Sequence, residues 1–174
     1  GLPGAQVFRL MFARDGAAWF ATAGGISRFD GYEFSNLTRT EGLPGVDAKG
    51  VAQTRDGDLW FACGLGGLVR YVPADSAGPA RAEAVSEPSL KRYDVELRST
   101  PDGALWARRF NGDVVRYEGK QETVFTNAYP LPSSYFTAYL AVAPDGRVWL
   151  TGAGSGLVRF DRTNMIRLTP KDGL

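Results

Sequence analysis

The stretch DGAAWFATAGGISRFDGYEF, residues 15–34, contains the pattern that decides the fold. An Asp-Gly pair is followed three residues later by Trp, and nine or ten residues after the Trp comes an Arg next to an aromatic residue. The pattern returns three more times, so four tryptophans stand 41 to 46 residues apart, at Trp19, Trp60, Trp106 and Trp149. A repeat of this length predicts a propeller, a solenoid or a similar array.

Each repeat consists of short apolar segments separated by turn residues. In the first repeat we expect strands at residues 7–13, 17–22, 26–30 and 32–37. Asp15-Gly16 predicts a tight hairpin turn, because Gly accepts a positive φ and Asp tolerates it. No segment of comparable length has the 3.6-residue period of a helix. The repeat is therefore predicted to be a four-stranded antiparallel meander.

The second strands are apolar on both faces, as in AAWFA (17–21) and DLWFA (58–62). A sheet needs this composition when it is stacked between two other sheets, as the blades of a β-propeller are. Each unit then depends on its neighbours to bury its surface, with the Trp between blades. The predicted fold class is all-β, with four four-stranded antiparallel propeller blades. We expect an arc of a larger propeller, and a closed four-bladed ring is the alternative.

The repeat boundaries predict one propeller segment over residues 1–174, with repeats at about 5–45, 46–94, 95–132 and 133–174. In the second repeat, residues 59–63 and 66–71 are expected to be strands, with a fourth strand near residues 90–93. Residues 73–89, rich in Pro, Ala and Ser, are expected to form a surface loop. Both ends of the sequence carry parts of a Gly-Leu-Pro lead-in, which indicates an excerpt. Uncovered terminal blades predict a homodimer through those faces.

Composition excludes several classes of function. The 20 basic and 19 acidic residues leave a net charge of +1, without the clustered basic face that nucleic acid requires. The absence of histidine excludes Ser-His-Asp and Cys-His catalysis and His-ligated zinc. No apolar stretch approaches the length of a membrane helix. The single cysteine, Cys63, is expected to be a small buried residue, and we expect neither a cofactor nor a metal.

The repeated Asp-Gly-x-x-Trp, Gly-Gly-x-x-Arg-aromatic and Gly-Leu-Pro elements resemble the two-component regulator propeller repeat. DGAAWFATAGGISRFDGYEF (15–34) with EGLPG (41–45), and DGDLWFACGLGGLVRY (56–71), are the best copies. The third repeat, DGALWARRFNGDVVRY, is the weakest. The resemblance covers nearly the whole chain and implies a periplasmic or extracellular input domain of a bacterial inner-membrane sensor. Such a domain recognises a small molecule, in some members an oligosaccharide, and passes the signal to a kinase or cyclase. The resemblance also implies that the rest of the parent propeller is a partner.

Most recurring residues are expected to be architectural. The glycine clusters at 64–67 and 152–156 resemble phosphate-binding loops, but no strand-to-helix transition follows them. The four tryptophans are predicted to be core rather than ligand-stacking platforms. The four repeated arginines, Arg28, Arg70, Arg116 and Arg159, are expected to pair with an acid such as one of a neighbouring blade.

The ligand-binding hypothesis rests on the places where the repeat is broken. Lead-in loops and second-to-third-strand loops are expected to share one propeller face. One such loop of the third repeat carries two cations, an aromatic ring and an amide, and residues 129–136 add further aromatic rings. Such a mixture suits a sugar, an anionic ligand or a protein partner. The predicted ligand-binding residues are Arg108, Arg109, Phe110, Asn111, Tyr129, Tyr135 and Phe136, against the alternative of a degenerate surface loop.

The sequence leaves three functions open. The leading interpretation is a non-catalytic sensor segment. The first alternative is a structural or protein-interaction propeller, and the second is a propeller lyase or hydrolase. No sequence motif favours the enzyme, although carboxylate pairs for glycoside hydrolysis are spatial and leave no fixed spacing.

Overall fold

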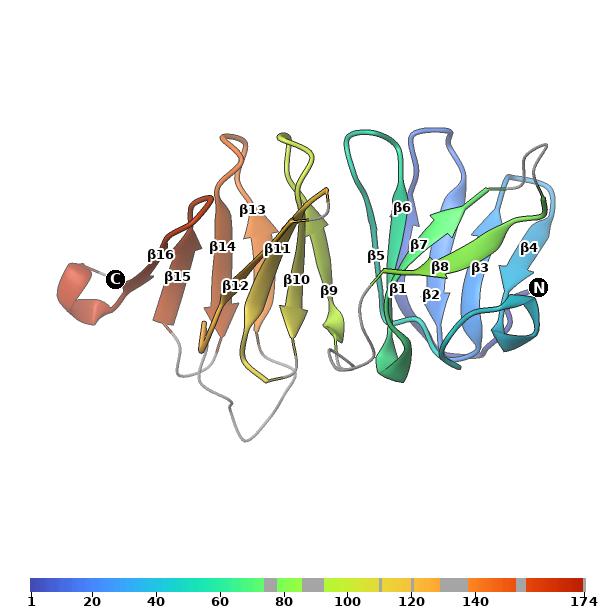
Figure 1. Ribbon diagram of the computed structural model, residues 1–174, viewed down its shortest axis with the longest axis horizontal. Coiled ribbons are helices and arrows are strands. Elements are labelled where there is room, and N and C mark those ends of the chain that lie inside the picture. Colours follow the sequence, from blue (N-terminus) through green and yellow to red (C-terminus); the bar gives the residue numbers. More distant parts are fainter. Residues whose placement is uncertain are drawn as a thin grey trace.

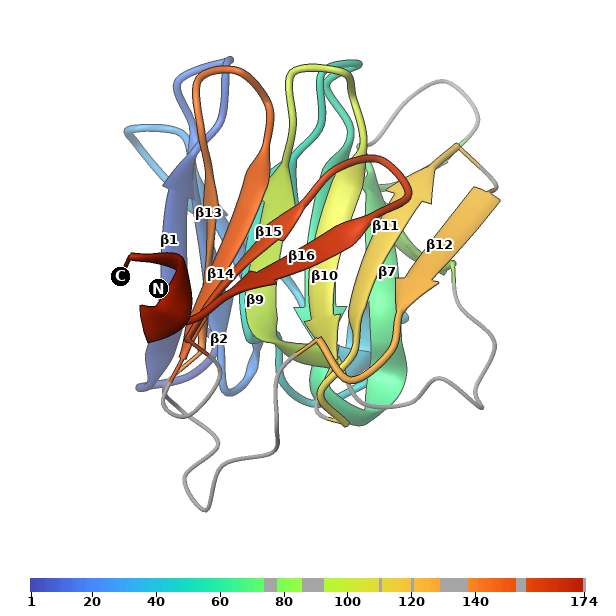
Figure 2. The same cartoon turned by 90° about the vertical axis from the view of Figure 1, so that its left-hand side faces the viewer.

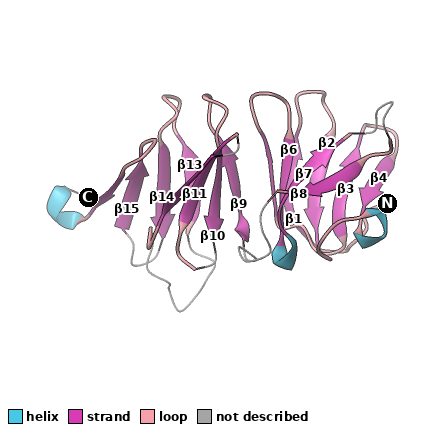
Figure 3. Cartoon of the chain, in the orientation of Figure 1, coloured by secondary structure: helices cyan, strands magenta, loops and turns pink. Residues whose placement is uncertain are grey.

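A computed structural model describes residues 1–73, 78–85, 93–109, 111–119, 121–128, 138–152 and 156–173. The described chain contains four antiparallel sheets of four strands each, in sequence order within each sheet (Figure 3). Blade 1 comprises β1 (Val7–Phe12), β2 (Ala18–Thr22), β3 (Gly25–Phe29) and β4 (Phe34–Leu37). Blade 2 comprises β5 (Gly50–Gln53), β6 (Leu59–Cys63), β7 (Gly67–Val72) and β8 (Arg81–Ala84). Blade 3 comprises β9 (Tyr93–Ser99), β10 (Leu105–Arg109), β11 (Val114–Glu118) and β12 (Gln121–Phe125).

Blade 4 comprises β13 (Tyr139–Val142), β14 (Val148–Gly152), β15 (Gly156–Phe160) and β16 (Met165–Leu168). Three single-turn 3₁₀ helices complete the described elements: η1 (Arg39–Glu41), η2 (Gly64–Gly66) and η4 (Pro170–Asp172). The predicted all-β fold class is confirmed. The predicted strands of blade 1 agree with the structure within one or two residues at each end.

Blade 2 differs from its prediction. Its fourth strand is β8, Arg81–Ala84, which lies inside the segment that we expected to be a surface loop. We expected the fourth strand of this repeat near residues 90–93. This is wrong for Tyr93, which begins the first strand of blade 3 instead. Residues 90–92 lie outside the described residues. β8 pairs with β7, with Ala84 opposite Val69 and Glu83 opposite Arg70. Hydrogen bonding to a neighbouring strand therefore forms β8, although its sequence RAEA contains no β-branched or aromatic residue.

The Asp-Gly pairs form the hairpin turns that the sequence predicts. The four turn glycines, at 16, 57, 103 and 146, have φ between 84° and 101°, a region that residues with a Cβ adopt only with strain. In each turn the Gly N–H donates to the carbonyl three residues before it, as in Gly16 to Ala13. The same backbone geometry in all four blades explains why the Asp-Gly pair recurs at the same position in every repeat.

The second-to-third-strand turns pack against the lead-in segments. A Cβ on Gly24 would lie 2.1 Å from the carbonyl oxygen of Pro3, and a Cβ on Gly66 would lie 2.8 Å from the backbone nitrogen of Gly45. These glycines allow two backbone segments to touch. This contact confirms the expectation that lead-ins and second-to-third-strand turns share one face. At Gly24 and Gly66 it also confirms that the glycines of these turns have a structural role.

Trp19, Trp60 and Trp106 pack between blades, as predicted, whereas Trp149 in the last described blade is only partly buried. Trp19 is 2% exposed, and its ring centroid lies 5.6 Å from that of Phe61 and 4.6 Å from that of Tyr71, both in blade 2. Trp106 of blade 3 meets Phe160 of blade 4 at 5.6 Å. One apolar cluster joins each consecutive pair of blades. Cys63 is fully buried in the first of these clusters, which confirms its prediction, and burial raises the pKa of its thiol.

The repeated arginines pair within their own blades. Arg28 lies 3.4 Å from Asp15, Arg70 lies 2.8 Å from Asp58, and Arg116 lies 2.9 Å from Asp102. Arg159 follows the same rule, at 3.9 Å from Asp161. The structural role that we expected is confirmed, but a neighbouring blade's acid is not the partner. Trp and Arg stand opposite one another on adjacent strands, as Trp19 and Arg28 do. In blades 1 to 3 the Arg therefore reaches the turn that precedes its own Trp, whereas Arg159 pairs with an acid two residues further along the chain.

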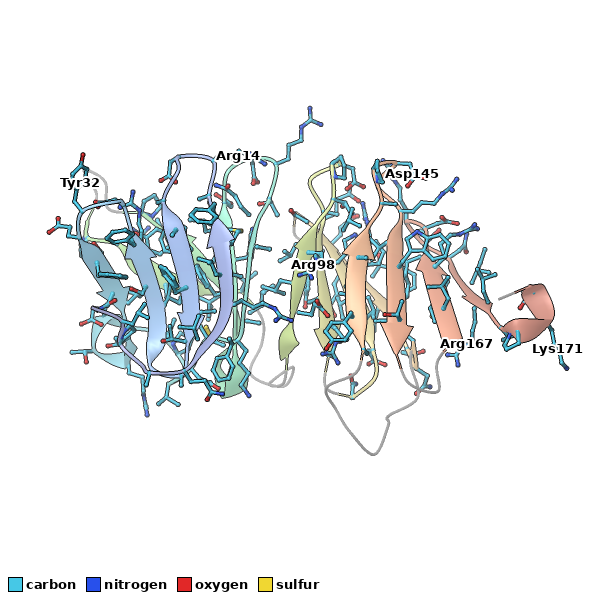
Figure 4. The ribbon with its side chains drawn as sticks, turned by 180° about the vertical axis from the view of Figure 1, so that it is seen from behind. Arg14, Tyr32, Arg98, Asp145, Arg167 and Lys171 are labelled. Atoms are coloured by element: carbon cyan, nitrogen blue, oxygen red, sulfur yellow. The ribbon has the colours of Figure 1, made fainter. Side chains whose placement is uncertain are left out.

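The four blades form an open arc. Blade 1 and blade 4 extend to opposite sides, while β8 and β12 lie in front of the molecule in Figure 1. From behind, the first strands β1 and β13 lie in front (Figure 4). Figure 2, which looks along the row of blades from blade 4, shows β1 and β13 on one side and β12 on the other. Consecutive first strands contact each other, β1 with β5, β5 with β9, and β9 with β13. The first strands therefore line the inside of the arc.

Candidate functional site

The inside of the arc holds a groove of about 870 Å³, which we call the axial groove. Residues of all four first strands and the segments that follow them contribute to it. Its lining comprises Arg9, Leu10, Met11, Phe12, Arg14, Val51, Ala52, Gln53, Glu96, Leu97, Arg98, Ser99, Tyr139 and Val142. Ligand sites occur preferentially where several elements converge in this way. Figure 4 views this side of the molecule and labels Arg14 and Arg98.

Glu96 on β9 is the central charged group of the axial groove. Its side chain is 1% exposed and lies 2.7 Å from Arg98 of the same strand. It also forms an ion pair of 3.8 Å with Arg9 of blade 1 and accepts a hydrogen bond of 3.0 Å from the backbone N–H of Leu140 in blade 4. A buried carboxylate requires such partners. Through this one side chain, three of the four blades are connected.

The axial groove carries an excess of positive charge among its described residues. Arg9 and Arg98 share the carboxylate of Glu96 and remain more than a third exposed. Arg14 donates to the backbone carbonyls of Arg55, at 2.6 Å, and Thr54, at 3.0 Å, so it has no acid among these contacts. Arginine presents several donors in a planar fork, which suits carboxylate and other anionic groups.

Aromatic and apolar surface lies beside these cations. Phe12 is 73% exposed and Tyr139 is 55% exposed, and both line the axial groove. A ring with one exposed face can stack on a sugar or another flat apolar surface, and the hydroxyl of Tyr139 adds a polar contact. The groove therefore combines guanidinium donors with aromatic rings from blades 1 and 4.

A second hollow, of about 430 Å³, lies between blades 3 and 4 at the Asp-Gly turns. Its charges are paired within the hollow. Arg116 contacts Asp102 at 2.9 Å and Glu118 at 2.6 Å, and Arg147 contacts Asp145 at 3.2 Å. Burial opposes ionisation of Asp102, but hydrogen bonds from Thr100 and Arg116 outweigh it and hold the pKa of this carboxyl below its ordinary value. These pairs stabilise the turns, and we regard the hollow as structural.

The predicted site residues are only partly described. Arg108 and Arg109, expected in a loop, lie in β10 and are buried, with 1% and 7% of their surface exposed. The loop assignment of these two residues is therefore wrong. Arg109 forms an ion pair with Glu122 on β12. Asn111 is exposed in the following turn and donates to Asp113 at 2.7 Å. The remaining four, Phe110, Tyr129, Tyr135 and Phe136, lie outside the described residues.

The sequence contains a signal for the axial groove. Six residues before each turn Asp, where the repeats are in phase, the chain has Arg9, Gly50, Glu96 and Tyr139. These four residues differ completely in chemistry, whereas their neighbours in the following position are all aliphatic. A position that varies inside an otherwise regular repeat marks a place where the blades differ, and three of these four residues line the groove.

Comparison with known proteins identifies the fold. No family model matches the chain, and no curated protein does. Among solved structures, the extracellular domain of a hybrid two-component system from B. thetaiotaomicron aligns with 97% of this chain and 25% of its own, at a TM-score of 0.73 and 17% identity. Virginiamycin B lyase from Staphylococcus aureus aligns with 97% of this chain and 57% of its own, at a TM-score of 0.67 and 19% identity.

An auxiliary nutrient binding protein from Bacteroides ovatus aligns with 94% of this chain and 41% of its own, at a TM-score of 0.62 and 10% identity. The chain thus spans between a quarter and about three-fifths of the proteins that it resembles. At these identities the similarity establishes the fold. The chain is an arc of β-propeller blades.

The described residues offer neither a metal site nor a membrane-spanning helix. They contain no group of three or more His, Cys, Asp or Glu side chains that could hold a metal ion. Within the same residues, no helix has the length and hydropathy needed to span a membrane.

Proposed function

We propose that this chain is a non-catalytic, ligand-sensing segment of a bacterial membrane signalling protein. In this proposal the segment lies on the periplasmic or extracellular side and passes ligand occupancy to a kinase or cyclase. The ligand occupies the axial groove. The exposed guanidinium groups of Arg9 and Arg98 favour a ligand with an anionic group, and the rings of Phe12 and Tyr139 favour a saccharide body.

The observation that carries this proposal is the connection of three blades through Glu96. An anionic ligand that binds Arg9 and Arg98 competes with Glu96 for the same donors. Loss of the Arg9–Glu96 pair releases the link between blade 1 and blade 3. A ligand shifts a conformational equilibrium only through contacts that differ between the two states, and this ion pair supplies such a difference. Binding in the axial groove can therefore alter how the blades sit together.

The comparisons support the proposal by analogy. One similar structure is the extracellular domain of a two-component system and another is a nutrient binding protein. Because one fold hosts many functions, the axial groove of this chain is the stronger argument. An enzyme finds less support, since the described carboxylate in the groove, Glu96, is held by two arginines and a backbone N–H.

The proposal is tested by calorimetric titration with acidic oligosaccharides, each paired with a neutral oligosaccharide of equal length. We expect the acidic members to bind more tightly. Arg9→Gln and Arg98→Gln should each weaken that binding at least about tenfold, because a hydrogen bond to a charged group contributes about 1.5–3 kcal/mol and about 1.4 kcal/mol is a factor of ten. Arg147→Gln is the matched control, since Arg147 pairs with Asp145 at a distant turn, and it should leave binding unchanged.

Three outcomes would contradict the proposal. One is equal affinity for acidic and neutral oligosaccharides, and another is an equal loss of binding in the Arg147 control. The third is turnover of any of these oligosaccharides by the wild-type chain, which would favour the enzyme. Circular dichroism melting of each variant separates loss of binding from loss of folding.

A further inference from the structure

A further hollow, of about 580 Å³, adjoins the axial groove at its Asp-Gly end, and we call it the groove mouth. Residues of all four blades line it: Arg14, Arg55, Ser99, Thr100, Pro101 and Val142. Arg14, Ser99 and Val142 also line the axial groove, so one ligand can contact both hollows. In Figure 4, Arg14 lies near the top, beside the Asp-Gly turns, and Arg98 lies about halfway down.

Two arginines of the groove mouth, Arg14 and Arg55, stand directly before the turn Asp of blades 1 and 2. Each reaches the turn of the following blade and donates to backbone carbonyls there. Arg14 donates to the carbonyls of Arg55, at 2.6 Å, and Thr54, at 3.0 Å, and Arg55 donates to that of Pro101 at 3.5 Å. These neutral acceptors hold the two side chains in place but leave their positive charges uncompensated.

The acids closest in sequence to these arginines are engaged elsewhere. Asp15 and Asp102 pair with the arginine of their own third strand, and Asp56 accepts a hydrogen bond from a threonine hydroxyl. Among the described residues, no carboxylate lines the groove mouth. A guanidinium has five N–H donors, and the carbonyl contacts use two of those of Arg14 and one of those of Arg55. The other donors are suited to an anionic group.

The groove mouth lies at a distance from the pair formed by Arg9 and Arg98. Arg9 stands six residues before the turn Asp of blade 1, and Arg14 stands one residue before it. Five residues of extended chain span up to about 17 Å. Between these two levels the axial groove presents the exposed ring of Phe12. A single sugar ring is too short for this span, whereas an oligosaccharide along the groove meets guanidinium groups at both ends and an aromatic ring between them.

We propose that the groove mouth is a second anion-binding subsite and that the ligand is an oligosaccharide with an acidic group at each end. This inference rests on the proposed function, in which Arg9 and Arg98 bind one acidic group. The other acidic group binds Arg14 and Arg55. Their carbonyl contacts fix the two side chains before the ligand arrives, which reduces the entropy lost on binding. Two separate pairs of cations in one groove also attract a dianionic ligand more strongly than a monoanionic one.

Calorimetric titration of the 174-residue chain with oligosaccharides of equal length tests this inference. One oligosaccharide is neutral, one is acidic at one end and one is acidic at both ends. The diacidic member should bind at least about tenfold more tightly than the monoacidic one, because its second acidic group forms hydrogen bonds to charged donors. The double variant Arg14→Gln, Arg55→Gln should lose this advantage, while the monoacidic member should still bind it more tightly than the neutral one does.

The matched control is the double variant Arg147→Gln, Arg162→Gln. It removes the same charge from the hollow between blades 3 and 4, where both side chains are exposed, and it should keep the full advantage of the diacidic member. Arg55→Gln alone preserves both carbonyl contacts of Arg14, so it should reduce the advantage in a chain that melts as the wild type does.

Equal affinity for the monoacidic and diacidic members, with weaker binding of the neutral one, overturns this inference and leaves the proposed function intact. An advantage that survives in the Arg14 and Arg55 double variant also overturns it, and so does an advantage that disappears in the control. Equal affinity for the neutral and monoacidic members contradicts the proposed function itself and, with it, the second subsite.

Discussion

In each of the Asp-Gly turns of blades 2 and 3, a threonine hydroxyl donates a hydrogen bond to the turn aspartate. Thr54 donates to Asp56 at 2.6 Å, and Thr100 donates to Asp102. For Asp56, the Thr54 hydrogen bond is the largest of the causes that lower the pKa of the carboxyl. Blades 1 and 4 have Ala13 and Ala143 at the equivalent position and form the same turn without a hydroxyl, through backbone hydrogen bonds and one backbone N–H that donates to the turn Asp. The hydroxyl therefore adds stability to a turn that glycine already permits.

Removing the hydroxyl of Thr100 should destabilise the chain in a pH-dependent way. The pKa of Asp102 is lowered in the folded state, so its contribution is present above the ordinary value near 4 and is lost as pH falls through the folded value. Thr100→Val should therefore cost about 1 kcal/mol at pH 7, and less at acidic pH. Urea unfolding at both pH values measures the difference. Thr100→Ser keeps the hydroxyl and should behave as wild type, whereas a pH-independent loss would contradict the argument.

At the scale of the element, close backbone contact explains the glycine clusters better than any ligand does. A Cβ on Gly66 would meet the backbone of Pro44 and Gly45, so Gly66→Ala forces apart the turn and the lead-in. Overpacking of this kind costs about 1–3 kcal/mol. We expect the amide signals of Leu43 and Gly45 to shift in NMR spectra. Gly57→Ala is the control, because Gly57 has φ +101 and open space around it, and its effects should stay within its own turn.

Second and third strands were predictable from sequence because Asp-Gly turns, Trp and Arg fix their phase. β8 was not, because RAEA carries no strand signal and forms only by pairing with β7. Arg108 and Arg109 were expected in a loop because the repeat pattern is broken at these positions, and charged side chains rarely lie in a buried strand. Arg109 does so with Glu122 as its partner. The role of Glu96 was not predictable from the sequence either. Its partners come from three blades, and residues so far apart in the sequence come together only in the folded chain.

At the scale of the whole molecule, stability depends on contacts between neighbours. Each apolar cluster joins one blade to the next, and in such repeat arrays the total approximates a sum of unit and interface contributions. The Arg9–Glu96 pair is an exception, because it links blades 1 and 3, which are not consecutive. An interface between blades can therefore fail locally while the rest of the arc remains folded.

Trp106→Ala tests this directly, because Trp106 is buried between blades 3 and 4 and contacts both Phe125 and Phe160. Truncation of a buried Trp costs about 3–5 kcal/mol. If interfaces act independently, hydrogen exchange should accelerate in β13–β16 while β2 and β6 keep their protection. Trp149→Ala removes the in-phase Trp of blade 4, which is only partly buried, and should cost much less. Uniform loss of protection in all four blades would instead mean that the arc unfolds as one cooperative unit, and the Glu96 links across blades would then outweigh the nearest-neighbour contacts.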